Sequence, residues 1–329
     1  MHIPDGFING ATSAAAGVIA AGGVGVSLRR AGRFLQDKRI PLTGLVAAFV
    51  FVLQMLNFPV AAGTSGHLLG GALAVILVGP WLGITAVAVV VIVQAFLFAD
   101  GGVSALGLNV LNMAILTGLT GWAVFRGLAR VLPRRWPTVI VATFAAGLAS
   151  VVASATGFVI QYGVGGSGGI DVDTVFGAMV GVHFVIGIGE GLISATVVGA
   201  VAASRPDLIT GTADLDIQGG KTSMSGRSIT GFVVAAVAIG LVLAFVVAPL
   251  ASSAPDGLER VAEDLGFADT ATDSAVSDSP LADYEVGGGG GTGLAGVIGA
   301  AVTLLVGIGG LTLWRRAQHR RREHSETPA

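Results

Sequence analysis

Residues 81–99 read WLGITAVAVVVIVQAFLFA, and this stretch contains no charged side chain. A helix of about 20 apolar residues crosses a hydrocarbon layer of roughly 30 Å, because each residue adds about 1.5 Å to its length. The stretch is therefore long enough and apolar enough to span a membrane. It disfavours a water-soluble protein built around one apolar core.

The composition of the whole chain points the same way. Of its 329 residues, 53% are apolar and 12% are charged, whereas soluble proteins carry about 25% charged residues. This balance excludes a disordered protein, which needs many charges and few apolar groups. The sequence has no cysteine, which excludes a disulfide-stapled secreted domain, a cytosolic redox protein and a zinc–thiolate site.

Similar apolar segments recur along the chain, and nine of them are candidate spans. They cover residues 11–28, 41–58, 67–79, 81–99, 105–125, 138–162, 174–203, 228–250 and 292–314. The third is too short to cross alone and is followed by Gly79 and Pro80. We expect it to be a short or re-entrant helix, which is tolerated only where protein surrounds its backbone. The predicted fold is an all-α polytopic membrane protein.

Basic residues are distributed unevenly between these segments. Four clusters hold Arg29, Arg30, Arg33, Lys38 and Arg39; Arg126, Arg130, Arg134 and Arg135; Arg205, Lys221 and Arg227; and Arg315, Arg316, Arg320, Arg321 and Arg322. With nine spans all four clusters lie on one side, and only Arg260 of the 18 basic residues lies on the other. The positive-inside rule makes the clustered side cytoplasmic. The N-terminus is then outside and the C-terminus cytoplasmic.

The chain is predicted to contain two membrane modules. Residues 1–203 form a seven-span helical bundle, and the polar segment 204–227 reads as a cytoplasmic linker. Residues 228–329 form a two-span module whose spans flank an acidic extracytoplasmic loop, 251–291. We expect that loop to be solvated, and the alternative is that its charge attracts cations weakly to the outer face.

The N-terminus itself is a candidate metal chelator. The start MHIPDG lacks the basic region of a signal peptide, and the large side chain of His2 disfavours removal of Met1. The Met1 amine and the His2 amide nitrogen can close a five-membered ring on a metal. The His2 amide and ring Nδ1 can close a six-membered ring. An imidazole from His67 would complete four nitrogen ligands, and planar nitrogen coordination selects Ni(II) or Cu(II) over Zn(II).

Those two histidines also have a plain structural interpretation. His2 can be a surface terminus, and His67 can be the residue that begins a short helix in the glycine-rich segment 63–71. Spacing alone does not choose between the two interpretations.

Four separated motifs resemble the CbiM/NikM family, the substrate-specific membrane components of energy-coupling factor transporters for cobalt and nickel. They are MHIPDGF (1–7), GTSGHLLGG (63–71), QAFLFADGG (94–102) and HFVIGIGEG (183–191). The resemblance implies that the N-terminal segment folds back into the bundle. It also implies that the Met1 amine, the His2 amide and imidazole and the His67 imidazole hold the metal. The implied partners are a CbiQ/NikQ-like transmembrane coupling protein and a CbiO/NikO-like cytoplasmic ATPase.

A second resemblance concerns the C-terminal module. Residues 255–259 read PDGLE, and with the following segment they resemble the NikN/CbiN-like auxiliary component, in which two spans flank an extracytoplasmic loop. That component is often a separate polypeptide, whereas here it is fused behind the seven-span unit.

Six further polar residues are candidates to position the ligands or the N-terminal segment. They are Asp5, Gln94, Asp100, Asn109, His183 and Glu190. His183 and Glu190 are seven positions apart and so share a helix face. Ionisable groups inside a membrane are costly and usually paired or functional. The rival hypothesis is an intramembrane metal-dependent hydrolase that uses His183 and Glu190, although no His-Glu-x-x-His pattern is present.

We therefore predict a multi-pass plasma-membrane protein that captures Ni(II) or Co(II) outside the cell. It holds no permanent cofactor and binds no nucleic acid. It does not hydrolyse ATP, because Gly219–Thr222 lacks the first glycine of a phosphate-binding loop and has Leu215 there. The motifs serve both metals, so neighbouring genes of cobalamin synthesis would indicate cobalt, and those of urease or hydrogenase would indicate nickel.

Overall fold

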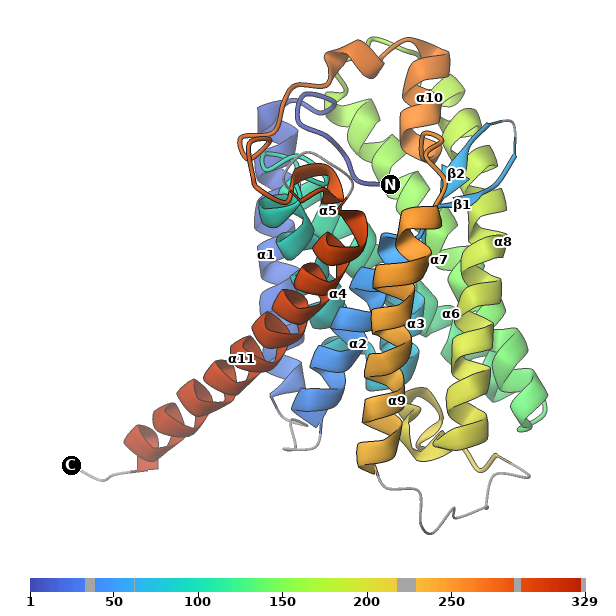
Figure 1. Cartoon of the computed structure of the whole chain (residues 1–329), viewed down its shortest axis with the longest axis vertical. Helices are drawn as coiled ribbons and strands as arrows, with labels where there is room; N and C mark the ends of the chain where they lie inside the picture. The colour runs from blue at the N-terminus through green and yellow to red at the C-terminus, as the bar shows by residue number, and fades with distance from the viewer. Residues whose placement is uncertain (33–38, 62, 218–228, 287–290, 327–329) are drawn as a thin grey trace.

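The apolar segments fold into helices in a computed structural model of the chain (Figure 1). The structure describes residues 1–32, 39–61, 63–217, 229–286 and 291–326. The first module contains α1 (Gly10–Ala31), α2 (Arg39–Gln54), α3 (Gly71–Val78), α4 (Pro80–Leu97), α5 (Leu106–Asn109), α6 (Thr117–Val131), α7 (Trp136–Gly165) and α8 (Val172–Ser204). A π-helix, Val110–Leu116, joins α5 to α6. Strands β1 (Phe58–Pro59) and β2 (Ser65–Gly66) form an antiparallel hairpin with Phe58 opposite Gly66.

The second module begins with α9 (Ile229–Val242), which continues through a π-helix, Leu243–Val247, and a 3-10 turn, Ala248–Leu250. The segment that follows contains α10 (Gly257–Leu265) and two 3-10 turns, Ala268–Thr270 and Ala282–Tyr284. The chain ends in α11 (Thr292–Glu326).

Seven of the described helices are long and apolar enough to cross a membrane. They are Gly10–Ala31, Pro80–Leu97, Leu106–Val131, Trp136–Gly165, Val172–Ser204, Thr230–Leu250 and Thr292–Gln318. The other two predicted spans are shorter: α2 has 16 residues and α3 has 8. The chain is a multi-pass membrane protein, while the count of nine crossings and the orientation of the termini stay predictions.

The short helix α3 packs inside the bundle, as expected for the third apolar segment. All eight of its residues are buried, and it packs on α4 and α6. Gly83 of α4 permits the close approach of α3, because a Cβ at this position would lie 2.6 Å from the Val75 backbone. Protein therefore surrounds the third apolar segment, which the sequence predicts to be too short to cross alone.

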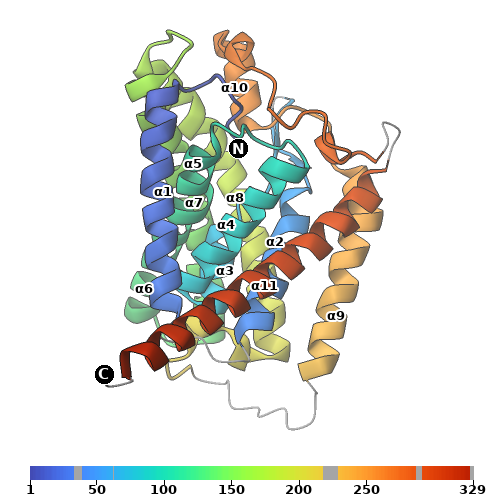
Figure 2. The ribbon, with the colours of Figure 1, turned by 90° about the vertical axis from the view of Figure 1, so that its left-hand side faces the viewer.

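The two modules pack against each other. Helix α11 crosses α2 and α4 obliquely, as Figure 2 shows, and α9 lies at the edge of the bundle with little of its surface covered. The predicted linker, 204–227, is described only as far as residue 217. Within that part Ile209 is buried, and Arg126 of α6 forms a bidentate ion pair with Asp214 at 2.5 and 2.6 Å. The module boundaries themselves stay predictions.

Residues 251–286, which we call the cap, cover the end of the bundle where the N-terminus lies (Figure 1). Backbone amides of Ser252, Thr272 and Asp283 donate to carbonyl oxygens of the first module at 2.8, 2.9 and 3.0 Å. The apolar face of α10 and the nearby aromatic ring are buried: Leu258, Val261, Ala262 and Phe267. The cap is thus folded around buried apolar side chains, while eight of its nine acidic side chains are exposed, as expected for a solvated loop, and Asp256 is the exception.

Candidate metal centre

The N-terminal segment inserts into the bundle in an extended conformation. Met1, Ile3 and Phe7 are buried. Asn109 pairs with both backbone groups of Ile3: its Oδ1 accepts from the Ile3 N–H at 2.8 Å, and its Nδ2 donates to the Ile3 carbonyl at 3.0 Å. The Gly102 N–H donates to the same carbonyl at 2.9 Å. The backbone N–H and carbonyl of the buried Ile3 are therefore satisfied outside any sheet.

Asp5 fixes the other end of this segment. Its carboxylate accepts hydrogen bonds from the backbone N–H groups of Val103 and Ser104 at 3.1 and 2.8 Å and from the Ser104 hydroxyl. The register of the N-terminal residues against the segment before α5 is set by these contacts and by those of Asn109.

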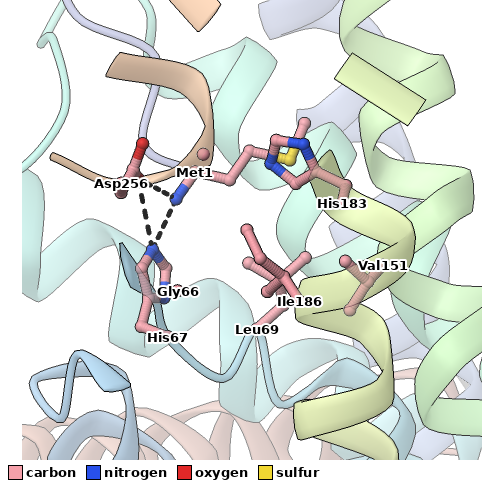
Figure 3. A pocket seen from close by; sticks show the side chains of 9 residues that line it. Met1, Gly66, His67, Leu69, Val151, His183, Ile186 and Asp256 are labelled. Atoms are coloured by element: carbon pink, nitrogen blue, oxygen red, sulfur yellow. Dashed lines mark hydrogen bonds and ion pairs between the residues drawn. The ribbon is translucent and has the colours of Figure 1, made fainter. Parts of the chain in front are cut away.

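The amine of Met1 lies between His67 and Asp256, as Figure 3 shows. It contacts Nε2 of His67 and donates to Oδ2 of Asp256 at 2.5 Å. The imidazole is 5% exposed, and its Nδ1–H donates to the Leu68 carbonyl at 3.0 Å. That hydrogen bond places the ring proton on Nδ1 and leaves a lone pair on Nε2. A neutral imidazole with a free lone pair is the form that binds a metal.

His2 stacks on His67, with ring centroids 5.2 Å apart and an interplanar angle of 19°. Its Nε2 lies 3.1 Å from Oε1 of Gln94, and its Nδ1 lies 3.0 Å from Oδ1 of Asp100. Burial lowers the pKa of the His2 imidazole to about 4, although the Asp100 carboxylate opposes this shift. The ring is therefore neutral, as ligation requires, but chelation through Nδ1 requires that the contact with Asp100 be given up.

Sequence reasoning did not single out Tyr284 of the cap as a site residue. Its hydroxyl donates to Oδ2 of Asp100 at 2.5 Å, and its ring stacks on Phe98 with centroids 4.7 Å apart. Burial and the neighbouring carboxylate raise the pKa of Tyr284 well above its usual range, so the phenol stays a hydrogen-bond donor. Its position 184 residues after Asp100 gives no local signal.

Sequence reasoning also missed the role of Asp256, which was counted only as one acid of the loop. It is the N-cap of α10, and its Oδ1 accepts from the N–H groups of Leu258 and Glu259 at 2.7 and 3.0 Å. Burial disfavours its charge, but the N-terminal ammonium and His67 outweigh burial and hold the pKa of the carboxyl well below its usual range. The capping-box spacing in PDGLE could have identified this aspartate as a helix cap, but not as a contact of Met1.

Glu190 and His183 both lie on α8 and are buried. Glu190 is fully buried and accepts from the N–H groups of Leu69 and Gly70 at 2.5 and 3.1 Å, directly after the His67 turn. His183 donates from Nδ1 to the Met179 carbonyl at 2.8 Å, and its Nε2 has no hydrogen-bond partner among the described residues.

A cavity of about 10 Å³ lies beside the amine. It is lined by Met1, Gly66, His67, Leu69, Val151, His183, Ile186, Asp256 and Gly257. This volume suits one water molecule or one ion and no larger ligand. The structure thus brings Met1 and His67 together beside this cavity, whereas His2 stacks on His67 and is not among the residues that line it. Every predicted positioning residue contacts the N-terminal segment, the His67 turn or this cavity.

Proteins with known names resemble this chain, one of them over nearly its whole length. A family model described as the cobalt uptake substrate-specific transmembrane region matches residues 2–208, and a PDGLE domain model matches residues 230–316. A protein of Archaeoglobus fulgidus, provisionally named fused nickel transport protein NikMN, is 34% identical over 311 residues, which cover 94% of this chain and 97% of that protein. The cobalt transport protein CbiM of Geobacter sulfurreducens is 31% identical over 226 residues, 67% of this chain and 64% of that protein.

A solved structure shares the fold. A crystal structure described as a transition metal transporter superposes with a TM-score of 0.56 at 25% sequence identity, and the match covers 67% of this chain and all of that one.

Proposed function

Because this chain belongs to the family of cobalt-uptake substrate-specific transmembrane proteins and carries a PDGLE domain, we propose that it is the substrate-capture component of an energy-coupling factor importer for Ni(II) or Co(II). The Met1 amine, the His2 amide and imidazole and the His67 imidazole bind the ion. A CbiQ/NikQ-like coupling protein and CbiO/NikO-like ATPases supply the energy. The chain itself is a transport component and not an enzyme, in line with relatives that are named as metal transport proteins.

One observation carries this proposal. The free amine of residue 1 lies against Nε2 of His67, 66 positions away in the sequence, at the buried end of a segment held by Asp5 and Asn109. A chain terminus is seldom buried, because its charge must be compensated. Its insertion beside a lone-pair imidazole nitrogen is what a ligand set built on the N-terminus requires.

The choice between the two metals rests on two considerations. Four nitrogen donors in a plane favour Ni(II), and the fused relative that matches almost the whole chain carries a nickel transport name. The family description itself names cobalt. Ni(II) is therefore the first ion to test, and Co(II) is the second.

The test uses the full chain with its native N-terminus, purified with a histidine-free tag at the C-terminus. Titration with NiCl₂ or CoCl₂ in a calorimeter should show one bound ion per chain. His2→Ala and His67→Ala should abolish binding, whereas His319→Ala should not. The same tag placed before Met1 should also abolish binding, because it converts the amine into an amide. Stoichiometric binding of unchanged affinity by the N-terminally tagged protein would refute the proposed ligand set.

A further inference from the structure

The carboxylate of Asp256 lies where a ligand of the bound ion would lie. Its Oδ2 is 2.5 Å from the Met1 nitrogen and 3.6 Å from Nε2 of His67. Donor atoms that share one ion at about 2.0–2.2 Å are themselves roughly 3 Å apart when they are neighbours. The Met1 nitrogen approaches the other two atoms more closely than this, as a hydrogen-bonded ammonium does, so an ion that takes the place of the ammonium protons would meet both nitrogens and this oxygen.

This oxygen is held in place by groups that have no part in ligation. Oδ1 is occupied by the two capping N–H groups of α10, which leaves Oδ2 directed at the amine. The preceding residues are tied to β2, since the Ser65 N–H donates to the Pro255 carbonyl at 2.8 Å and its hydroxyl donates to the Ala254 carbonyl at 2.7 Å. Strand β2 leads directly into His67, so these contacts fix the carboxylate and the imidazole to one another.

The residue after Asp256 shows how closely the cap approaches. Gly257 has no side chain, and a Cβ at this position would lie 2.6 Å from Cδ1 of Ile186 and 2.9 Å from Cε1 of His183. A larger residue would push α10 away from α8. Glycine thus permits the depth at which the aspartate reaches the amine.

Charge gives a second, independent argument. The side chain of Asp256 is 12% exposed, and it is the only negative group that touches the amine among the described residues. A bound dication with neutral amine, two neutral imidazoles and one deprotonated amide has a net charge of +1. The Asp256 carboxylate reduces this charge to zero, just as it now balances the ammonium. A buried site is thereby spared an uncompensated charge.

Asp100 is the other carboxylate nearby, and it is placed differently. It faces the His2 ring, bonds to Tyr284 and has a quarter of its side chain exposed. Solvent therefore screens part of the negative charge of Asp100. Asp256, and not Asp100, is the carboxylate that contacts the Met1 amine.

We propose that Oδ2 of Asp256 is an oxygen donor to the transported ion, contributed by the PDGLE module to a ligand set whose nitrogens come from the first module. The inference rests on the proposed function and extends it. An oxygen donor added to the four nitrogens makes Ni(II) five-coordinate and, because a carboxylate is a weak-field ligand, favours the paramagnetic state. Four nitrogens alone give a yellow, diamagnetic, square-planar ion.

The decisive variants keep the fold and change only this oxygen. Asp256→Asn retains a strong N-cap but replaces the anionic oxygen, and Asp256→Ser also caps a helix but does not reach the amine. Glu263→Gln removes one charge from an exposed position of the same helix and is the matched control. Each full-length protein, with its native N-terminus, is titrated with NiCl₂ and examined by optical absorption and magnetic susceptibility.

The wild type and Glu263→Gln should bind paramagnetic Ni(II). Both Asp256 variants should bind about 10- to 100-fold more weakly, and the nickel that they bind should be yellow and diamagnetic. A nickel spectrum that is the same in the wild type and in Asp256→Asn would overturn the inference, whatever the affinities. If the wild type binds neither Ni²⁺ nor Co²⁺, the proposed function fails. If His2→Ala abolishes binding while Asp256→Asn leaves spectrum and affinity unchanged, only the role of Asp256 fails.

Discussion

Glu190 binds the backbone of the turn that carries His67, and not the imidazole itself. Its two oxygens accept from consecutive amides, Leu69 and Gly70, while Gln54 donates to the Leu69 carbonyl at 2.7 Å. A carboxylate that holds two amides fixes the backbone direction, and the backbone in turn sets where the imidazole points. Groups of this kind tune a metal site without contacting the ion.

Glu190→Ala should therefore impair both stability and binding. Each buried N–H left unpaired costs about 1–3 kcal/mol, so the thermal unfolding midpoint should fall. The affinity for Ni²⁺ should fall at least about tenfold, because the His67 turn is no longer held. Calorimetry and a thermal melt of the purified protein measure the two effects. Glu285→Gln, at an exposed position of the cap, is the control. A destabilised variant with wild-type affinity would contradict the positioning role.

The proton balance of binding is a second prediction at this scale. The pKa of His2 is held near 4, so this ring is already neutral at neutral pH and releases no proton on ligation. The protons come from the ammonium and from the His2 amide. Metal binding should therefore release two protons and weaken as the pH falls. Titrations at one pH in buffers of different ionisation enthalpy give the proton number directly, and a value near zero would exclude ligation by both nitrogens.

At the scale of elements, the cap is joined to the first module through the contact between Tyr284 and Asp100. Tyr284→Phe removes the hydroxyl but keeps the ring stacked on Phe98. A hydrogen bond to a charged group contributes about 1.5–3 kcal/mol, so the cap should detach more readily. Limited proteolysis should cut the cap faster in the variant than in the wild type, and bound Ni²⁺ should slow both. Equal cleavage rates would show that this bond does not retain the cap.

Most of the helices were predictable from sequence because their apolar runs are long and are bounded by polar residues or by glycine and proline. The short buried α3 followed from the same rule, since eight residues cannot cross a bilayer. The π-helix Val110–Leu116 and the fold of the cap had no comparable signal. Asp256 and Tyr284 reach the site through contacts between distant parts of the chain, which spacing and composition do not encode. Met1, His2 and His67 could be proposed because chelate-ring chemistry is local, because His67 offered the further imidazole, and because a family resemblance implied the same three residues.

At the scale of the molecule, the predicted orientation can be tested directly because the sequence has no cysteine. Ser277 lies in the cap and Arg134 lies between α6 and α7, and both are exposed. Ser277→Cys should react with a membrane-impermeant thiol reagent on intact cells. Arg134→Cys should react only after permeabilisation. The opposite pattern would invert the topology and place the metal site on the cytoplasmic side.

The cap is connected at both ends to helices of the same chain that supplies the nitrogen ligands: α9 precedes it, and α11 follows it and packs on α2 and α4. Its encounter with the N-terminus is therefore unimolecular. For a tethered segment the effective concentration reaches the millimolar range, so individually weak contacts suffice to close it. Closure is also independent of expression level, because every bundle carries exactly one cap. Separate polypeptides would have to find each other in the membrane, whereas in this chain opening and closing follow first-order kinetics.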